Sequence, residues 1–317
     1  MEVRHLQHFV ALSEEGSFTR AAQRMHIVQS GLSASIKELE VELGSRLVER
    51  TTRRVALTET GRLFLEHARA TLTAMEAGVT AVRSQDGVVR GRLRMGILQS
   101  LGPYLELPLL LKRFRAAYPE VEIAVRALNT DSIPGLVASG DVDLSFHALV
   151  NRMEWPGVQV IPYVEDSLVA VCSVDHLRRP AGSVSLEALA QGTFVDLSPD
   201  RALRRVVDRM FAEHHVKRNT VFEVSDAQTA LQFVEMDMGV AVVPSALARP
   251  LAAERRIRLL KISNEAPRPP AWRIAILRRV RQKGLRGKST VDLFLEALEG
   301  MPRAPKNVAG KGWSARA

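Results

Sequence analysis

An apolar residue recurs at every third or fourth position along one stretch of this chain. The spacings are 3, 4, 3, 4 and 3, and the residues are Leu65, Ala68, Leu72, Met75, Val79 and Val82. Such a heptad seam is typical of a helix that packs along a second helix. Thr58 can cap a helix from about 59 to 85, which would span roughly 40 Å. The short head before it cannot bury so long a seam, so we expect these six residues to form a dimer interface. The alternative is that the seam packs on its own chain.

Residues 4–43 show the periodicity of three short helices. Ser17 is a suitable N-cap for the second of them. In the third, four apolar residues lie on one face and four small or polar residues point away from it. The apolar residues are Leu32, Ile36, Leu39 and Leu43, and the others are Ser30, Ser33, Ala34 and Lys37. The pattern fits a helix-turn-helix that offers a polar face to the major groove of DNA. It fits equally a three-helix core with a solvated serine face.

Residues 47–57 consist of two short apolar runs on either side of a basic, threonine-rich turn. This pattern is typical of a β-hairpin, which would form a wing beside the helices. Arg50, Arg53 and Arg54 would then reach DNA phosphates. A solvated basic loop is the alternative.

The formal net charge of the chain is +9, but the excess is not concentrated in this head. Residues 1–90 contain 12 basic and 11 acidic residues, whereas 301–317 contain four basic residues and no acidic one. Bulk charge is therefore weak support for nucleic-acid binding, and local placement of the basic residues has to carry it. The Pro-, Gly- and Lys-rich segment 301–317 is predicted to be a disordered basic tail.

Several classes of protein are disfavoured. No run of roughly 18 apolar residues could span a membrane, and the first residues do not begin a signal peptide, so we expect a cytoplasmic, nucleoid-associated protein with no membrane partner. The single cysteine, Cys172, excludes an intrachain disulfide and suits a small buried strand residue. No motif of a nucleotide-binding loop, nucleophile elbow or zinc protease is present. His214 and His215 diverge by about 100° on a helix and cannot chelate one metal. We expect no enzyme activity, catalytic residue, cofactor or metal.

From residue 92 onward, short β-rich runs alternate with amphipathic stretches. Ten strands are predicted between 93 and 277, and helices over 103–117, 131–139, 201–215, 226–237 and 289–299. This alternation indicates an α/β fold with parallel sheets covered on both faces.

Residues 2–65 resemble the N-terminal signature of LysR-type transcriptional regulators. The matching residues are Leu6–Val10, Glu15–Ala22, Gln29, Leu32–Ser33, Ile36, Leu39–Glu40, Leu43–Gly44, Arg46–Leu47, Glu49–Arg50, Leu57–Thr58, Gly61 and Leu65. Residues 92–300 match only in their pattern. The chain departs from the family at Ser30 and Gly31, where proline and alanine are usual, and at Ala34 and Ser35, where arginine and glutamine are common. A base contact that needs a long side chain at 34 is therefore not carried over.

The resemblance implies a winged helix-turn-helix over 1–58, a linker and dimerisation helix over 59–90, and an effector-binding domain over 91–300. That domain would be two-lobed, of the periplasmic-binding-protein type II kind, with lobe I at 91–161 and 268–300 and lobe II at 162–267. Crossovers near 161–163 and 266–268 would form the hinge. The implied function is sequence-specific regulation of transcription. The partners would be an inverted-repeat operator in double-stranded DNA, a second copy in a homodimer or dimer of dimers (homotetramer), and RNA polymerase.

Two sets of contact residues follow from this. The set expected at DNA is Thr19, Gln29, Ser30, Ser33, Lys37, Arg50, Arg53 and Arg54. The set expected at an effector lies at predicted strand ends and helix starts between the lobes, and consists of Gln99, Ser100, Thr130, His147, Ser198 and Asp226. Hydroxyls beside the N–H groups of helix starts suit a carboxylate, so a small organic acid is expected. The alternatives are plain helix caps for the hydroxyl residues and Asp226, and a satisfied polar residue for His147.

Two other classes of function stay open. One is an enzyme with binding-protein lobes and a helical appendage, which turnover of a metabolite by 91–300 would indicate. The other is an architectural DNA-binding protein without an effector, which the lack of any ligand-dependent melting shift would indicate.

Overall fold

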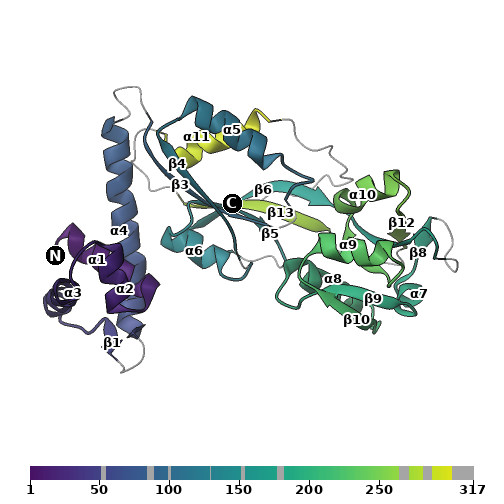
Figure 1. Ribbon diagram of the computed structural model, residues 1–317, viewed down its shortest axis with the longest axis horizontal. Coiled ribbons are helices and arrows are strands. Elements are labelled where there is room, and N and C mark those ends of the chain that lie inside the picture. Colours follow the sequence, from purple (N-terminus) through teal and green to yellow (C-terminus); the bar gives the residue numbers. More distant parts are fainter. Residues whose placement is uncertain are drawn as a thin grey trace.

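The N-terminal part of the chain folds into a helical head with a hairpin and one long helix (Figure 1). The computed structural model describes residues 1–50, 55–83, 89–98, 101–128, 130–150, 154–176, 182–263, 271–280 and 288–301. The head comprises α1 (Val3–Glu15), α2 (Phe18–Arg24), α3 (Gln29–Leu43), β1 (Val48–Arg50) and β2 (Val55–Leu57), and the long helix is α4 (Glu59–Arg83). β1 and β2 pair antiparallel, which confirms the predicted hairpin.

The head is held together by the apolar face predicted for its third helix. Leu32, Ile36 and Leu39 are fully buried with Phe9 and Leu12 of α1. The prediction is wrong for Leu43, the last residue of α3, which is 37% exposed. Ser17 caps α2 as predicted, since its side chain accepts a hydrogen bond from the N–H of Arg20.

The long helix α4 divides its seam between two environments. Thr58 caps it as predicted, because the N–H of Gly61 donates to the Thr58 hydroxyl at 2.8 Å. The early seam residues belong to the head: Ala68 is 1% exposed, and Leu65 and Leu72 pack against the head's core. Ala68 is therefore covered by its own head, as in the alternative that the seam packs on its own chain, while a dimer interface at the half-buried Leu65 and Leu72 stays a prediction. Met75 and Val79 are exposed at 38% and 43%, while the side chain of Val82 lies outside the described residues.

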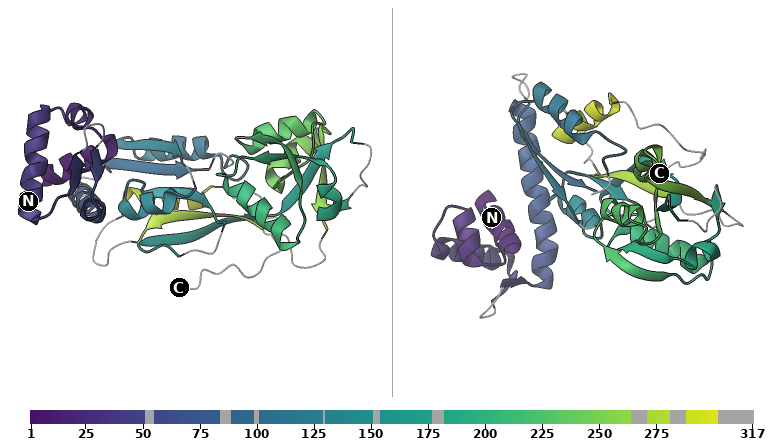
Figure 2. Two further views of the ribbon diagram at one scale, coloured as in Figure 1. Left: turned by 90° about the horizontal axis from the view of Figure 1, so that it is seen from below. Right: turned by 45° about the vertical axis from the view of Figure 1, so that its right-hand side comes forward.

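A five-stranded sheet forms the core of what we call the first lobe. Its order is β4 (Val121–Ala127), β3 (Gly91–Ile97), β5 (Leu144–Ala148), β13 (Trp272–Arg279) and β6 (Val158–Asp166). Alternate residues of β13 enter different cores, because Ile274 and Ile276 pack in one cluster and Ala275 and Leu277 in another. Helices α5 (Leu107–Ala117) and α11 (Thr290–Glu299) lie together on one side of the sheet, and α6 (Ile133–Ser139) packs on the other, next to α4 (Figures 1 and 2).

The second lobe contains a four-stranded sheet and a parallel pair of strands, which a parallel bridge between Phe194 and Val240 links to the sheet. The sheet consists of β11 (Ala241–Pro244), β7 (Leu168–Ser173), β12 (Ile257–Ile262) and β8 (Ser183–Val184), and the pair of β10 (Asn219–Val224) and β9 (Thr193–Leu197). The helices are α7 (Leu186–Ala190), α8 (Ala202–Glu213), α9 (Ala227–Glu235) and α10 (Ser245–Ala253).

Several fold predictions need correction. The sheets are mixed, because β13 runs antiparallel to β5 and β6, and β7 runs antiparallel to β11 and β12. The reason is that the chain returns to the first lobe through β13 rather than through a helical crossover. Three short elements were not predicted: β8, the five-residue α7, and α10, which contains Pro250.

The change of lobe occurs at Ser167, later than the 161–163 crossover. β6 stays paired with β13 through Asp166, with a register shift opposite Ile274 and Ala275. The second predicted crossover at 266–268 and residues 302–317 lie outside the described residues. Among the helices that the structure describes, none has the length and apolarity that a membrane crossing requires.

Candidate functional site

Four of the residues predicted for DNA lie along the first half of α3. Gln29 and Ser30 at its start and Lys37 in its middle are exposed, and Ser33 is half-buried. The hydroxyl of Thr19 on α2 donates to Oε1 of Gln29 at 3.3 Å, which joins the two helices on the exposed side. The first turn of α3 has no side-chain cap, since its N-cap residue is Val28, which is 71% exposed. Its free N–H groups and the positive end of the helix dipole suit a phosphate.

Ser35, a position where the sequence departs from the family, lies inside the head. Its side chain is 7% exposed and lies 2.8 Å from Nδ1 of His8 on α1. Burial, with help from His5 and Arg4, lowers the pKa of His8, which favours the neutral ring in this contact. Ser35 therefore fastens α1 to α3, whereas Ala34 beside it is exposed and small.

Glu40 positions the wing, a role that the sequence analysis missed. Its Oε1 accepts hydrogen bonds from the N–H groups of Leu47 at 2.8 Å and Val48 at 3.0 Å. The hairpin therefore leaves α3 at a fixed angle. The side chain of Arg50, and Arg53 and Arg54 entirely, lie outside the described residues.

A second polar cluster joins the two lobes. Nη1 of Arg205 on α8 lies 2.5 Å from Oδ1 of Asp131, and Nη1 of Arg209 donates to the Val150 carbonyl at 2.8 Å. Asp131 and Val150 belong to the first lobe and α8 to the second. These two contacts therefore hold the lobes in their present arrangement.

His147, at the end of β5, lies in this cluster. It is 3% exposed and makes an edge contact with Trp155, with ring centroids 5.5 Å apart. Its Nδ1 is buried with no hydrogen-bond partner among the described residues. The same holds for Nε and Nη2 of Arg205 and for Nε of Arg201. Each buried polar group without a partner costs about 1–3 kcal/mol, so an acceptor placed here would be strongly favoured.

The other residues predicted for an effector lie less favourably. Thr130 is half-buried beside Asp131, and Gln99 and Ser100 lie outside the described residues. The Ser198 hydroxyl donates to the Val224 carbonyl at 3.2 Å, and Oδ1 of Asp226 accepts from the Thr229 N–H at 2.9 Å as the cap of α9. The alternative of a plain cap is thus confirmed for Asp226.

Arg201, Arg205 and Arg209 were missed as site residues. They recur every four residues, which places them on one face of a helix. This spacing was visible in the sequence, but nothing there showed that the face lies against the first lobe.

Acid should destabilise the protein through His147. Burial, and then the nearby Arg205, lower its pKa to about 4. The unfolded histidine takes up its proton near 6.5, so stability present above that pH is lost as the pH falls toward 4. At pH 4 the loss amounts to about 3 kcal/mol. Denaturant titrations at pH 7.5 and 4 should show His147→Gln losing less stability than the unsubstituted chain by this amount. Exposed His67→Gln is the control, and an equal pH effect in both variants would contradict the assignment.

Two family models match the chain and together cover most of it. The model described as bacterial regulatory helix-turn-helix protein, lysR family, matches residues 3–62. The model described as LysR substrate binding domain matches residues 86–301.

Individual relatives agree with this. The uncharacterized HTH-type transcriptional regulator YnfL of Escherichia coli strain K12 is 32% identical over 259 residues, which are 81% of this chain and 86% of that one. The DNA-binding transcriptional dual regulator OxyR of the same strain is 29% identical over 255 residues, 80% of this chain and 82% of that one.

Solved structures share the fold along almost the whole chain. A full-length OxyR variant from Pseudomonas aeruginosa has a TM-score of 0.69 at 24% identity, covering 94% of this chain and 92% of that chain. CbnR in complex with its target DNA has a TM-score of 0.57 at 23% identity, covering 94% of this chain and 99% of that chain.

Proposed function

The chain belongs to the LysR family of DNA-binding transcriptional regulators, which are not enzymes, and from that premise we propose that a small carboxylate bound between its lobes controls its binding to an operator. The carrying observation is the set of buried polar atoms on Arg201, Arg205 and His147 that lack a partner in the part of the chain that the structure describes. A carboxylate could take paired hydrogen bonds from Arg205, which is the strongest anion contact an arginine makes. Because these groups come from both lobes, the ligand would alter the angle between them.

Some relatives carry the name hydrogen peroxide-inducible genes activator, which raises peroxide as another signal. A thiol that reacts with peroxide has to be accessible and readily deprotonated. The single cysteine of this chain, Cys172, is 1% exposed in the middle of β7. This burial favours the carboxylate over a thiol-based peroxide sensor.

The proposal includes a homodimer, held by the part of α4 that its own head leaves open. Met75 and Val79 are large apolar residues on that part and are exposed in the single chain. A twofold dimer would present two copies of α3 to half-sites about 34 Å apart, which suits an inverted repeat. Assembly into a dimer of dimers and contact with RNA polymerase are further parts of the proposal, supported by membership of the family.

The DNA part is tested by gel shifts of the full-length protein on its own upstream intergenic DNA, over a salt series. Arg53→Ala should weaken binding to all sequences alike and reduce the logarithmic salt slope by about one, as expected for one lost phosphate contact. Ser33→Ala should instead relax discrimination among operator variants. Unchanged binding of Ser33→Ala to every variant would remove Ser33 from the reading face, and loss of all shifts in competitor DNA would contradict specific binding.

The ligand part is tested with a panel of small carboxylates and their uncharged amides in thermal-shift and gel-shift assays. An acid that raises the melting temperature and changes the operator shift should bind about 30-fold or more weakly to Arg205→Gln, because a buried charged hydrogen bond is lost. Exposed Arg256→Gln, in the same lobe, is the matched control. Equal affinity in both variants would exclude the interlobe cluster as the binding site.

A further inference from the structure

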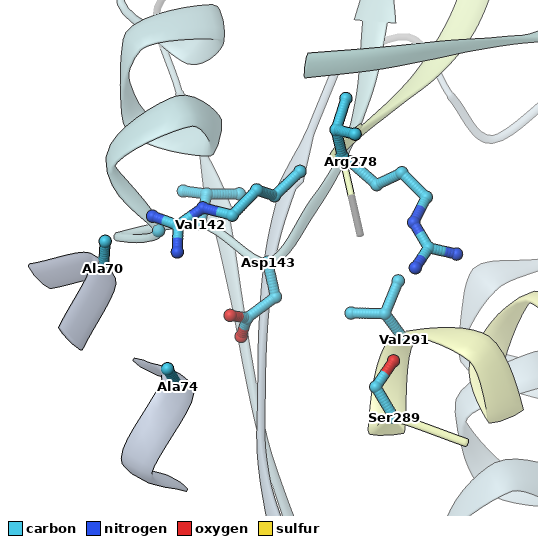
Figure 3. A pocket seen from close by; sticks show the side chains of 10 residues that line it. Ala70, Ala74, Val142, Asp143, Arg278, Ser289 and Val291 are labelled. Carbon is cyan, nitrogen blue, oxygen red and sulfur yellow. The ribbon is translucent and has the colours of Figure 1, made fainter. Parts of the chain in front are cut away.

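A cavity of about 140 Å³ lies at the joint between α4 and the first lobe, far along β5 from His147. Its apolar wall consists of Ala70, Ala74, Val142, Val280 and Val291, and its polar wall of Gly140, Asp143, Arg278, Arg279 and Ser289. Figure 3 shows Ala70 and Ala74 of α4 on one side, opposite Asp143, with Arg278 above Ser289 and Val291 on the other side. The cavity thus has one wall on the linker helix and one on the effector-binding domain.

The walls are held in place by contacts beside the cavity. Nη1 of Arg69 on α4 lies 2.5 Å from Oδ2 of Asp141, which ties the helix to the turn before β5. Gly140 in that turn has φ +83°, and a Cβ there would meet Nη2 of Arg279 at 2.6 Å. The positive φ favours glycine at position 140, and a larger residue there would also displace the end of the Arg279 side chain.

Three of the four arginines around the cavity are paired with carboxylates. Arg69 pairs with Asp141 at 2.5 Å and with Glu14 at 3.2 Å, Arg94 with Asp143 at 2.8 Å, and Arg278 with Asp292 at 2.7 Å. The guanidinium of Arg279 donates only to the Ala138 carbonyl, at 2.8 and 3.1 Å, and no carboxylate of the described residues lies within ion-pair distance of it. Arg279 is therefore the arginine of this cavity that has no direct ion pair among the described residues. Burial lowers the pKa of Arg279, and the more distant carboxylates of Asp143 and Asp141 raise it only in part.

A further donor is available on the opposite wall. Nε of Arg278 is buried and has no hydrogen-bond partner within the described part of the chain. The carboxylate of Asp143, which would repel an anion, is occupied by Arg94, since its two oxygens accept from the Arg94 main-chain N–H and side chain. A negatively charged acceptor beside Arg279 would therefore meet no unpaired carboxylate.

We propose that this joint is a second ligand site, which takes a short-chain monocarboxylate. Its carboxylate would contact Arg279, and its alkyl chain the alanines of α4 together with Val142 and Val291. An apolar cavity of about 150 Å³ holds benzene, so a ligand with about as many heavy atoms, such as butyrate, fits the volume. A ligand there contacts α4 and the first lobe at once, so it would strengthen the joint between the DNA-binding and effector-binding parts.

The test is isothermal titration calorimetry of full-length protein with butyrate, with butyramide as its uncharged isostere and with inorganic phosphate. Arg279→Gln should weaken butyrate binding at least about 10-fold, and Ala74→Leu should abolish it by filling the cavity. Arg273→Gln on the same strand, whose side chain pairs with Glu165, is the matched control and should bind as the unsubstituted chain does. Melting curves of each variant verify that it is folded.

The outcomes separate this site from the interlobe site. Butyrate binding that survives Arg205→Gln but is lost in Ala74→Leu supports the joint. Binding that is lost in Arg205→Gln and unchanged in Ala74→Leu and Arg279→Gln overturns it, while leaving the proposed function intact. Equal binding of butyrate and butyramide, no butyrate binding at all, or phosphate binding that alone depends on Arg279 also overturns the proposal of a monocarboxylate site.

Discussion

Replacing Asp166 with alanine should lower the free energy of unfolding of the effector-binding region by about 3 kcal/mol or more. The carboxylate is 5% exposed and accepts four hydrogen bonds. They come from the Tyr104 hydroxyl at 2.8 Å, the Ser245 hydroxyl at 2.7 Å, and the N–H groups of Ser167 at 2.8 Å and Ala246 at 2.9 Å. Alanine would leave the buried hydroxyls of Tyr104 and Ser245 without this acceptor, and the N–H groups of Ser167 and Ala246 would lose it as well.

Because of its position, replacing Asp166 should also affect the connection between the two lobes. It is the last residue of β6, immediately before the chain changes lobe, and it joins Tyr104 of the first lobe to the start of α10 in the second. A carboxylate at the start of α10 also interacts favourably with that helix dipole. Loss of the side chain should therefore loosen the hinge as well as the fold, and ligand-dependent changes in operator binding should weaken.

Denaturant unfolding followed by circular dichroism measures the first effect. Asp166→Asn, which keeps one acceptor oxygen, should fall between alanine and the unsubstituted chain. The exposed Asp175→Ala in the same lobe serves as the control. If Asp166→Ala and Asp175→Ala unfolded at the same denaturant concentration, the four hydrogen bonds would not have the importance assigned to them.

The second large effect is expected at Gly61, at the start of α4. A Cβ there would lie 2.1 Å from the carbonyl oxygen of Leu47, 3.0 Å from its carbonyl carbon and 3.2 Å from its Cα. All three are backbone atoms, so no side-chain rotation can relieve the overlap, and the wing or α4 has to move. Gly61→Ala should destabilise the head by about 2–4 kcal/mol and abolish specific operator binding.

A glycine on the same helix provides the control for Gly61→Ala. A Cβ added at Gly78 would meet no atom of the described residues within 4 Å, so Gly78→Ala should be neutral or stabilise the helix by up to about 1 kcal/mol. Thermal melts and gel shifts of both variants make the comparison. Normal operator affinity in Gly61→Ala would show that the wing can shift without consequence.

Features that depend on residues close together in the chain could be predicted from the sequence, whereas contacts between residues far apart in the chain could not. The helices of the head, the caps at Ser17 and Thr58 and the hairpin follow from local spacing, and all are present. The importance of Asp166 could not be predicted, because its partners Tyr104 and Ser245 lie 62 and 79 residues away in the chain. Gly61 was recognised only as a residue that matches the family signature. Glycine is required there because the backbone of Leu47 lies close to it, and that contact is not visible in the sequence.

The candidate ligand residues illustrate an ambiguity of chemistry. An oxygen at a helix start can cap the helix or line a pocket, and the sequence does not distinguish these uses. Asp226 caps α9, and Ser198 is hydrogen-bonded to Val224. The four-residue spacing of the arginines at α8 is a clearer indication of a binding site than these oxygens are. It could be interpreted only once the fold placed Asp131 opposite Arg205.

The contact of Arg69 with Asp141 forms a pivot point on α4. This contact holds the helix near its middle. The wing and head lie on its N-terminal side, and the exposed Met75 and Val79 lie on its C-terminal side. At 1.5 Å per residue the helix extends about 15 Å from Arg69 to its N-terminal end and about 21 Å to its C-terminal end. A tilt of about 10° about Arg69 would move these ends by about 3 and 4 Å in opposite directions, close to the rise of one base pair. A small rotation at the middle of α4 would therefore displace the head by about the length of one base-pair step.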